Sequence, residues 1–229
     1  MGAAAVSRAQ LAGKAVVRLG GGTIVISALL FGPAGTFDYW QAGLLLATVM
    51  ALLVSVAAYL LITDPARFER RMRTREREKE QRLVVLIGAV AFGAAFLVPG
   101  LDRRFDWSPI PPLVSIAGNF GIVAGYLLFY FVMRVNSYAS RVIEVAEHQR
   151  VISTGPYAVV RHPMYVASFV IFLSSPIALG SWWGLVAMLP QVFVYVARIL
   201  NEEAVLARDL AGYAEYMQRT RYRLIPGIW

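Results

Sequence analysis

Residues 41–62 read QAGLLLATVMALLVSVAAYLLI, an apolar run without a single charged side chain. A helix that crosses a hydrocarbon core of about 30 Å needs about 20 mostly apolar residues. The whole chain has the same character, because 58% of its 229 residues are hydrophobic and only 16% are charged. The sequence therefore predicts an all-α, polytopic integral membrane protein.

Three further apolar runs support this interpretation, and we expect spans at residues 19–31, 83–101 and 113–133. The first is short unless the helix begins earlier, with Arg18 reaching the membrane surface through its long side chain. Glycines 20–22 lie in this run. No strand precedes them, so we expect them to serve close helix packing rather than dinucleotide binding.

The last apolar stretch, residues 164–200, is too long for one span. We expect residues 174–176, which read SSP, to interrupt it, and Gly180 with Ser181 to form a turn. The stretch then forms two rather short helices in a hairpin. The complete prediction is a helical bundle of about six spans.

The basic residues indicate how these spans are oriented. Of the 22 lysines and arginines, only Arg103 and Arg104 fall on one side of the predicted membrane. Basic loops stay in the cytoplasm, so we expect both termini there, in a bacterial inner membrane. This distribution explains the net charge of +8 without nucleic acid as a partner. A cleaved signal peptide ending near residues 33–35 is an alternative for the N-terminal run.

The segment 63–82 between the second and third spans is densely charged. Asp64 and Pro65 suit an N-cap and a first helical position, and arginine alternates with glutamate after them. We expect a solvated cytoplasmic helix that touches anionic headgroups. We divide the chain into N-terminal membrane helices, residues 1–133, and a C-terminal region, residues 134–229.

Few residues in this chain can supply catalytic chemistry. It has no cysteine, and its two histidines are His148 and His162, so we expect no metal centre. Polar residues crowd at two places beside predicted spans: residues 147–165, which read EHQRVISTGPYAVVRHPMY, and residues 198–203, which read RILNEE. Polar clusters at such positions in membrane proteins mark functional sites. We interpret His148 as part of the loop structure.

The two clusters share a motif order: Gly155, Pro156, Tyr157, then Arg161, His162, Pro163 and Tyr165, then an apolar hairpin, then Glu202 and Glu203. This combination resembles the isoprenylcysteine carboxyl methyltransferase family and the related phospholipid N-methyltransferases. Ala167 stands where that family often has glycine. The ending RLIPGIW, with Tyr213 and Tyr216 before it, is similar to bacterial members.

The resemblance implies a methyltransferase that uses S-adenosylmethionine and binds it in a cytoplasmic pocket. The cofactor-binding residues that it implies are Gly155, Pro156, Tyr157, Arg161, His162, Tyr165, Glu202 and Glu203. The chemistry is suitable, since the cofactor presents a carboxylate that suits arginine, histidine and backbone N–H groups. Its ammonium or ribose suits a glutamate, and its sulfonium or adenine suits a tyrosine ring.

Arg198 and Glu202 are four residues apart and share a helix face, whereas Glu203 points about 100° away. Two interpretations stay open: a simple Arg198–Glu202 ion pair, or an arginine that binds an anionic group of the methyl acceptor. We take Arg198 and Glu202 as the candidate catalytic pair. The acceptor is a lipidic or small hydrophobic molecule whose identity the sequence leaves open.

Three other functions compete with this prediction. A phospholipid N-methyltransferase would use the same cofactor on an amine. A sterol-reductase-like membrane enzyme has a similar C-terminal region but uses NADPH. A small transporter or assembly factor would bind neither cofactor, so ligand binding distinguishes these classes.

Overall fold

The computed structural model describes residues 7–72, 79–136, 138, 145 and 149–229. Over these residues the chain is helical, with one isolated bridge and no strand, so the all-α prediction is confirmed. The helices are α1 (Arg8–Ala34), α2 (Trp40–Thr63), α3 (Pro65–Arg71), α4 (Lys79–Phe105), α5 (Pro112–Val135), the 3₁₀ helix η1 (Gly155–Ala158), α6 (Pro163–Ala178), α7 (Trp182–Asp209) and α8 (Tyr213–Arg219).

Within the described residues, five helices are long and apolar enough to cross a membrane: α1, α2, α4, α5 and α7. The apolar helix α6 has only 16 residues. It corresponds to the first of the two short hairpin helices among the six spans that the sequence predicts. Helix α7 has 28 residues, so the expectation of two short helices is wrong for α7. At 1.5 Å per residue α7 is about 42 Å long, and one end of it extends past a hydrocarbon core.

The hairpin turns at one of the two expected places. Residues 179–181 connect α6 to α7, Gly180 adopts a left-handed φ of 80°, and the Ser181 side chain caps α7 by accepting a hydrogen bond from the Gly184 N–H at 2.9 Å. The interruption expected at residues 174–176 is wrong, because α6 continues through Pro176. Pro176 lies in the last turn of α6, so only two residues of the helix follow the hydrogen bond that it removes and the bend that it causes.

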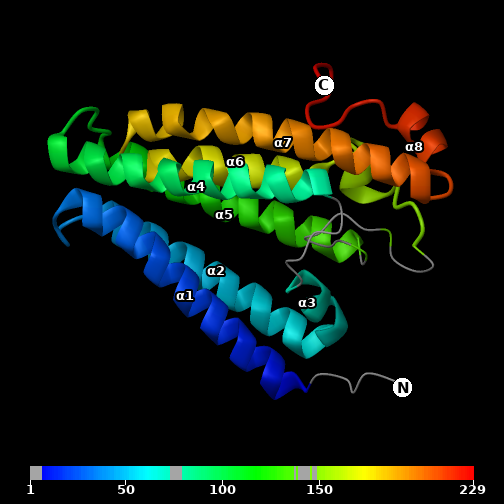
Figure 1. The fold of residues 1–229 in the computed structure, drawn as a ribbon, viewed down its shortest axis with the longest axis horizontal. Coiled ribbons are helices and arrows are strands. Elements are labelled where there is room, and N and C mark those ends of the chain that lie inside the picture. Colours follow the sequence, from blue (N-terminus) through cyan, green and yellow to red (C-terminus); the bar gives the residue numbers. More distant parts are fainter. Residues whose placement is uncertain (1–6, 73–78, 137, 139–144, 146–148) are drawn as a thin grey trace.

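The helices form antiparallel pairs, and Figure 1 shows α1 with α2 beside a group made by α4, α5, α6 and α7. The α1–α2, α4–α5 and α6–α7 connections lie at the same end, which we call the turn end. The start of α1, helices α3 and α8 and the C-terminus lie at the opposite end, which we call the basic end. Arg103 and Arg104 fall at the turn end, so the basic residues that the structure describes are separated as the sequence predicts.

Small residues bring α5 and α6 into close contact. A Cβ atom on Gly118 would lie 2.5 Å from the Ala178 nitrogen, and one on Gly125 would lie 2.6 Å from the Ile171 side chain. Both distances are too short for any side chain, so these glycines permit the backbone approach. The packing role expected for glycines 20–22 is wrong, because a Cβ on any of them would meet nothing within 4 Å.

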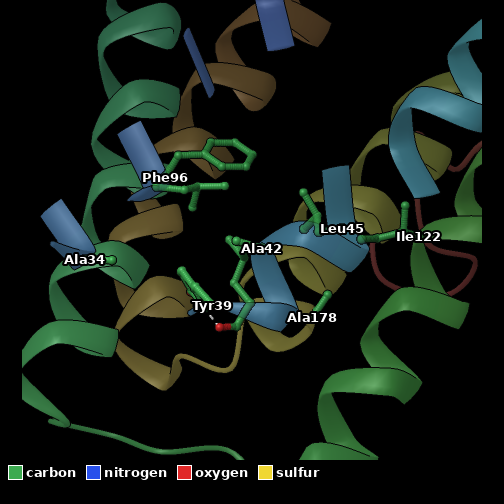
Figure 2. Close-up of a cluster of buried hydrophobic side chains, with 9 residues drawn as sticks. Ala34, Tyr39, Ala42, Leu45, Phe96, Ile122 and Ala178 are labelled. Carbon is green, nitrogen blue, oxygen red and sulfur yellow. Dashed lines mark hydrogen bonds between the residues drawn. The ribbon is translucent and has the colours of Figure 1, made fainter. Parts of the chain in front are cut away.

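A buried apolar cluster joins the two groups of helices near the turn end. Figure 2 shows Ala34 of α1, Ala42 and Leu45 of α2, Phe96 of α4 and Ile122 of α5 facing a shared interior. Tyr39 lies in the same cluster, where its hydroxyl donates to the Leu179 carbonyl oxygen at 2.7 Å. The cluster therefore joins α1 and α2 to α4, α5 and α6 near the turn end.

The charged segment after α2 begins as predicted. The Asp64 carboxylate accepts a hydrogen bond from the Arg67 N–H at 2.9 Å, and α3 starts at Pro65. Residues 73–78 of the expected helix 63–82 lie outside the described residues. The division of the chain at residues 133 and 134 stays a prediction.

Candidate active site

A buried carboxylate at the basic end organises the predicted site. Glu203 of α7 is 6% exposed, and its Oε1 atom accepts from Arg161 Nε at 2.6 Å and from His162 Nε2 at 3.1 Å. Its Oε2 atom accepts from Arg223 Nε at 2.8 Å. We call Glu203 with Arg161, His162 and Arg223 the Glu203 hub. A charge this deeply buried is stable only because cationic and hydrogen-bonding partners surround it.

Backbone contacts bring the partners of Glu203 together. The Arg161 N–H donates to the Tyr222 carbonyl oxygen at 2.9 Å, and the His162 N–H donates to the Arg223 carbonyl oxygen at 3.0 Å. The C-terminal segment therefore lies against the loop that precedes α6. His162 is the N-cap residue of α6. Pro163 follows at the first helical position, where its missing backbone N–H costs no hydrogen bond within the helix.

Arg161 uses most of its donors within the protein. Besides its bond to Glu203, its Nη1 atom donates to the carbonyl oxygens of Thr220 at 3.0 Å and Arg221 at 2.9 Å. These carbonyls follow the end of α8, where helical partners are missing. Arg161 thus connects α7, α8 and the C-terminal segment, and it is only 7% exposed.

The second glutamate has a different environment. Glu202 is half-buried, and its Oε2 atom accepts a hydrogen bond from the Tyr165 hydroxyl at 2.8 Å. The Arg198 side chain also interacts with that hydroxyl. The Tyr165 ring packs edge-on against His162 at 5.7 Å and Tyr195 at 5.5 Å. Tyr165, Arg198 and Glu202 therefore form one group beside the Glu203 hub. Among the described residues, the Glu202 carboxylate has fewer hydrogen-bond partners than the Glu203 carboxylate.

The remaining motif residues, Gly155, Pro156 and Tyr157, stabilise the loop that precedes α6. Gly155 has a left-handed φ of 59° at the start of η1, and a Cβ there would lie 3.3 Å from the Val135 side chain. Pro156 accepts the N–H groups that close η1. The Tyr157 hydroxyl accepts from Asn136 Nδ2 at 2.9 Å, and its carbonyl oxygen accepts from the Tyr216 hydroxyl at 2.8 Å. These contacts connect α5, η1 and α8.

Sequence reasoning missed one member of the hub. Arg223 was counted only as a basic residue, although it lies in the RLIPGIW ending that carried part of the resemblance. Its guanidinium also stacks over the Trp229 ring at 5.3 Å. The resemblance of this ending to bacterial family members was the available signal, but nothing in the sequence indicates that its arginine contacts α7. His148, expected to be loop structure, lies outside the described residues.

Residues 113–211 match the family model described as phospholipid methyltransferase. This segment contains α5, η1, α6 and α7, with every residue of the predicted site. It is a phospholipid methyltransferase family domain. The resemblance to the phospholipid methyltransferases, inferred from the motif order, is thereby confirmed.

The fold can also be compared with a solved structure, described as the eukaryotic intramembrane Ras methyltransferase ICMT (isoprenylcysteine carboxyl methyltransferase) without a monobody. The sequence identity is 16% and the TM-score is 0.47, and the match covers 93% of this chain and 86% of that chain. No curated protein matches this sequence.

Proposed function

We propose that this protein is an S-adenosylmethionine-dependent methyltransferase that modifies a lipidic or small hydrophobic acceptor at the cytoplasmic face of a bacterial inner membrane. The observation that carries the proposal is the meeting of the Glu203 hub with the Tyr165–Glu202 pair inside a phospholipid methyltransferase family domain. Both groups lie at the basic end, the end that the positive-inside rule assigns to the cytoplasm.

The side chains of the site suit the proposed cofactor. The family domain supports this choice of cofactor over NADPH. Glu202 is a carboxylate next to a hydroxyl, a combination that suits an ammonium or a sugar hydroxyl. Aromatic rings at His162, Tyr165 and Tyr195 lie nearby and suit a sulfonium or a flat base. When bound, the cofactor would supply an electrophilic methyl group.

The protein's own contribution is alignment and exclusion of water. Methyl transfer is an in-line displacement that needs few protein groups beyond those that hold the reactants in line. Glu203 holds Arg161, His162 and the C-terminal segment in one arrangement, and His162 orients the ring of Tyr165. We assign Glu203, Arg161 and Arg223 to positioning, and Glu202 with Tyr165 to ligand contact.

Arg198 is the candidate for the methyl acceptor. It lies one helical turn closer to the membrane than Glu202, on the same face of α7. A planar guanidinium at that level suits a carboxylate or phosphate on a molecule whose apolar part stays in the lipid. A carboxylate acceptor needs no base, whereas an amine acceptor has to lose a proton, which gives Glu202 a second role.

Ligand binding tests the proposed function. Purified protein in detergent should bind S-adenosylhomocysteine in calorimetry and should not bind NADPH. His162→Ala, Tyr165→Ala and Glu202→Gln should each weaken this binding by about 1 to 3 kcal/mol, while Glu215→Gln on the exposed surface of α8 should not. Affinity that is unchanged in all three variants would place the cofactor elsewhere.

A second measurement separates cofactor from acceptor. Arg198→Ala should reduce methyl transfer to a phospholipid or prenylated test acceptor much more than it reduces S-adenosylmethionine affinity. Arg198→Lys should restore little, because lysine lacks the planar fork. Equal losses of turnover and affinity would assign Arg198 to the cofactor instead.

A further inference from the structure

Tyr213, the first residue of α8, has a hydroxyl group that the site described so far does not use. The side chain is 4% exposed, and its ring packs beside Tyr216 with the centroids 5.7 Å apart. The hydroxyl oxygen is buried and has no hydrogen-bond partner among the residues that the structure describes. Leaving a buried polar group unpaired destabilises the folded protein.

The neighbouring tyrosine shows that this is not a general property of α8. Tyr216 is equally buried, but its hydroxyl donates to the Tyr157 carbonyl oxygen at 2.8 Å. Phenylalanine would pack Tyr213's ring equally well and would avoid the cost of the buried hydroxyl. The Tyr213 hydroxyl thus lacks a partner among the described residues, and a bound ligand can supply one.

The position of Tyr213 points to that partner. Leu206, which follows Glu202 and Glu203 by one helical turn, packs against the cluster that contains Tyr213. Arg161 contacts the carbonyl oxygen of Thr220 just after α8, so α8 lies directly against the Glu203 hub. Burial raises the pKa of Tyr213 well above its usual value, and the Glu203 and Glu202 carboxylates raise it further. The hydroxyl keeps its proton at neutral pH and is a donor.

The chemistry of the neighbours restricts what this donor can bind. A ligand carboxylate would lie in the field of two glutamates, which disfavours it, and the neighbouring Arg161 already donates to Glu203 and to two backbone carbonyl oxygens. A ligand hydroxyl avoids this repulsion, since its oxygen accepts from Tyr213 while its hydrogen donates to a glutamate. Glu202 is the suitable glutamate, because both oxygens of Glu203 already accept from the hub.

We propose that Tyr213 binds a ribose hydroxyl of the methyl donor, with Glu202 as the second contact of the same sugar. The inference rests on the proposed function and deepens it. It adds to the ligand site a residue of α8, outside the segment that matches the family model. It also gives the paired glutamates separate tasks, Glu203 in positioning and Glu202 in sugar recognition.

The test is Tyr213→Phe, measured by calorimetry with S-adenosylhomocysteine and with its 2′-deoxy and 3′-deoxy analogues. The variant should bind the parent ligand about five- to tenfold more weakly, as expected for one lost hydrogen bond. One of the two deoxy analogues should bind wild type and variant equally, because it lacks the hydroxyl that Tyr213 contacts. Glu215→Gln, at an exposed position of α8, should change none of these affinities.

Melting of the ligand-free protein separates this role from a structural one. Removing an unpaired buried hydroxyl should leave the melting temperature of Tyr213→Phe unchanged or raise it. A lower melting temperature, an unchanged affinity, or an equal loss for all three ligands would each overturn the ribose contact. Wild-type protein that fails to bind S-adenosylhomocysteine would instead overturn the proposed function.

Discussion

The two ends of α7 are each fixed by one buried carboxylate, but the two carboxylates have different partners. At the basic end, Glu203 is held by two arginines and a histidine. At the turn end, Asp102 of α4 is 3% exposed and takes its hydrogen bonds from neutral groups: the Ser108 N–H at 2.8 Å and the hydroxyls of Ser108 and Ser181. We call this second group the Asp102 hub.

The difference follows from what each end has to hold. The Asp102 hub joins the end of α4, the connection that follows it and the start of α7. Each of these segments belongs to a membrane-spanning helix or directly adjoins one. The Glu203 hub holds the C-terminal segment against the loop before α6, and that segment has no span of its own. Opposite charges give the stronger and longer-range attraction that this docking needs. The same concentration of charge makes the basic end suitable for binding a charged cofactor.

The largest expected contrast between the ends is their exposure to opposite sides of the membrane. The chain has no cysteine, so single Asp106→Cys and Glu215→Cys substitutions report one position each. In intact cells an impermeant thiol reagent should label position 106 almost completely and position 215 only after the membrane is permeabilised. The reverse pattern would place the Glu203 hub outside and contradict a cytoplasmic cofactor site.

The next largest effect should come from Glu203→Gln, which keeps the shape of the side chain but leaves Arg161 and Arg223 without a buried counter-charge. Breaking such a pair costs about 3 to 5 kcal/mol. Chemical unfolding in detergent should show this loss, and hydrogen exchange should rise in residues 220–229 first. Glu215→Gln is the matched control. A loss as small as that of the control would mean that the hub does not hold the C-terminal segment.

Asp102→Asn should cost less, about 1 to 3 kcal/mol, because the partners it leaves are neutral: two hydroxyls that can reorient and one backbone N–H. The same unfolding assay measures this value, with Asp106→Asn at an exposed position as its control. S-adenosylhomocysteine affinity should not change, since the Asp102 hub lies at the other end of α7. An equal or greater loss than for Glu203→Gln would reverse the proposed ranking of the two ends.

The smallest effect should come from Arg223→Lys, about 1 kcal/mol. Lysine keeps the charge beside Glu203 but loses the fork and the flat contact with Trp229. The partial exposure of Arg223 weakens its ion pair through solvent screening. Arg221→Lys is the control, because that residue contributes its backbone carbonyl and not its side chain to the hub. No difference between the two variants would show that charge alone holds the segment.

The sequence by itself determined the membrane class, the approximate positions of the first four spans and the separation of charge between the two ends. Each of these depends on local composition: whether about 20 consecutive residues are apolar is independent of what they pack against. The motif order between Gly155 and Glu203 likewise indicated a methyltransferase site, because the chemistry of a family is retained in short runs. The same local reasoning failed at residues 174–176, where helix packing kept a proline within α6.

Only the tertiary structure decided which contacts the residues of the candidate site make. Glu202 and Glu203 are adjacent in sequence and chemically identical, but a rotation of about 100° around α7 directs one to Tyr165 and the other into the hub. That Arg223 reaches Glu203, and that the Tyr213 hydroxyl is buried without a partner among the described residues, depend on how the C-terminal segment folds back. Burial and partners are properties of contacts between distant segments, and no local pattern encodes them.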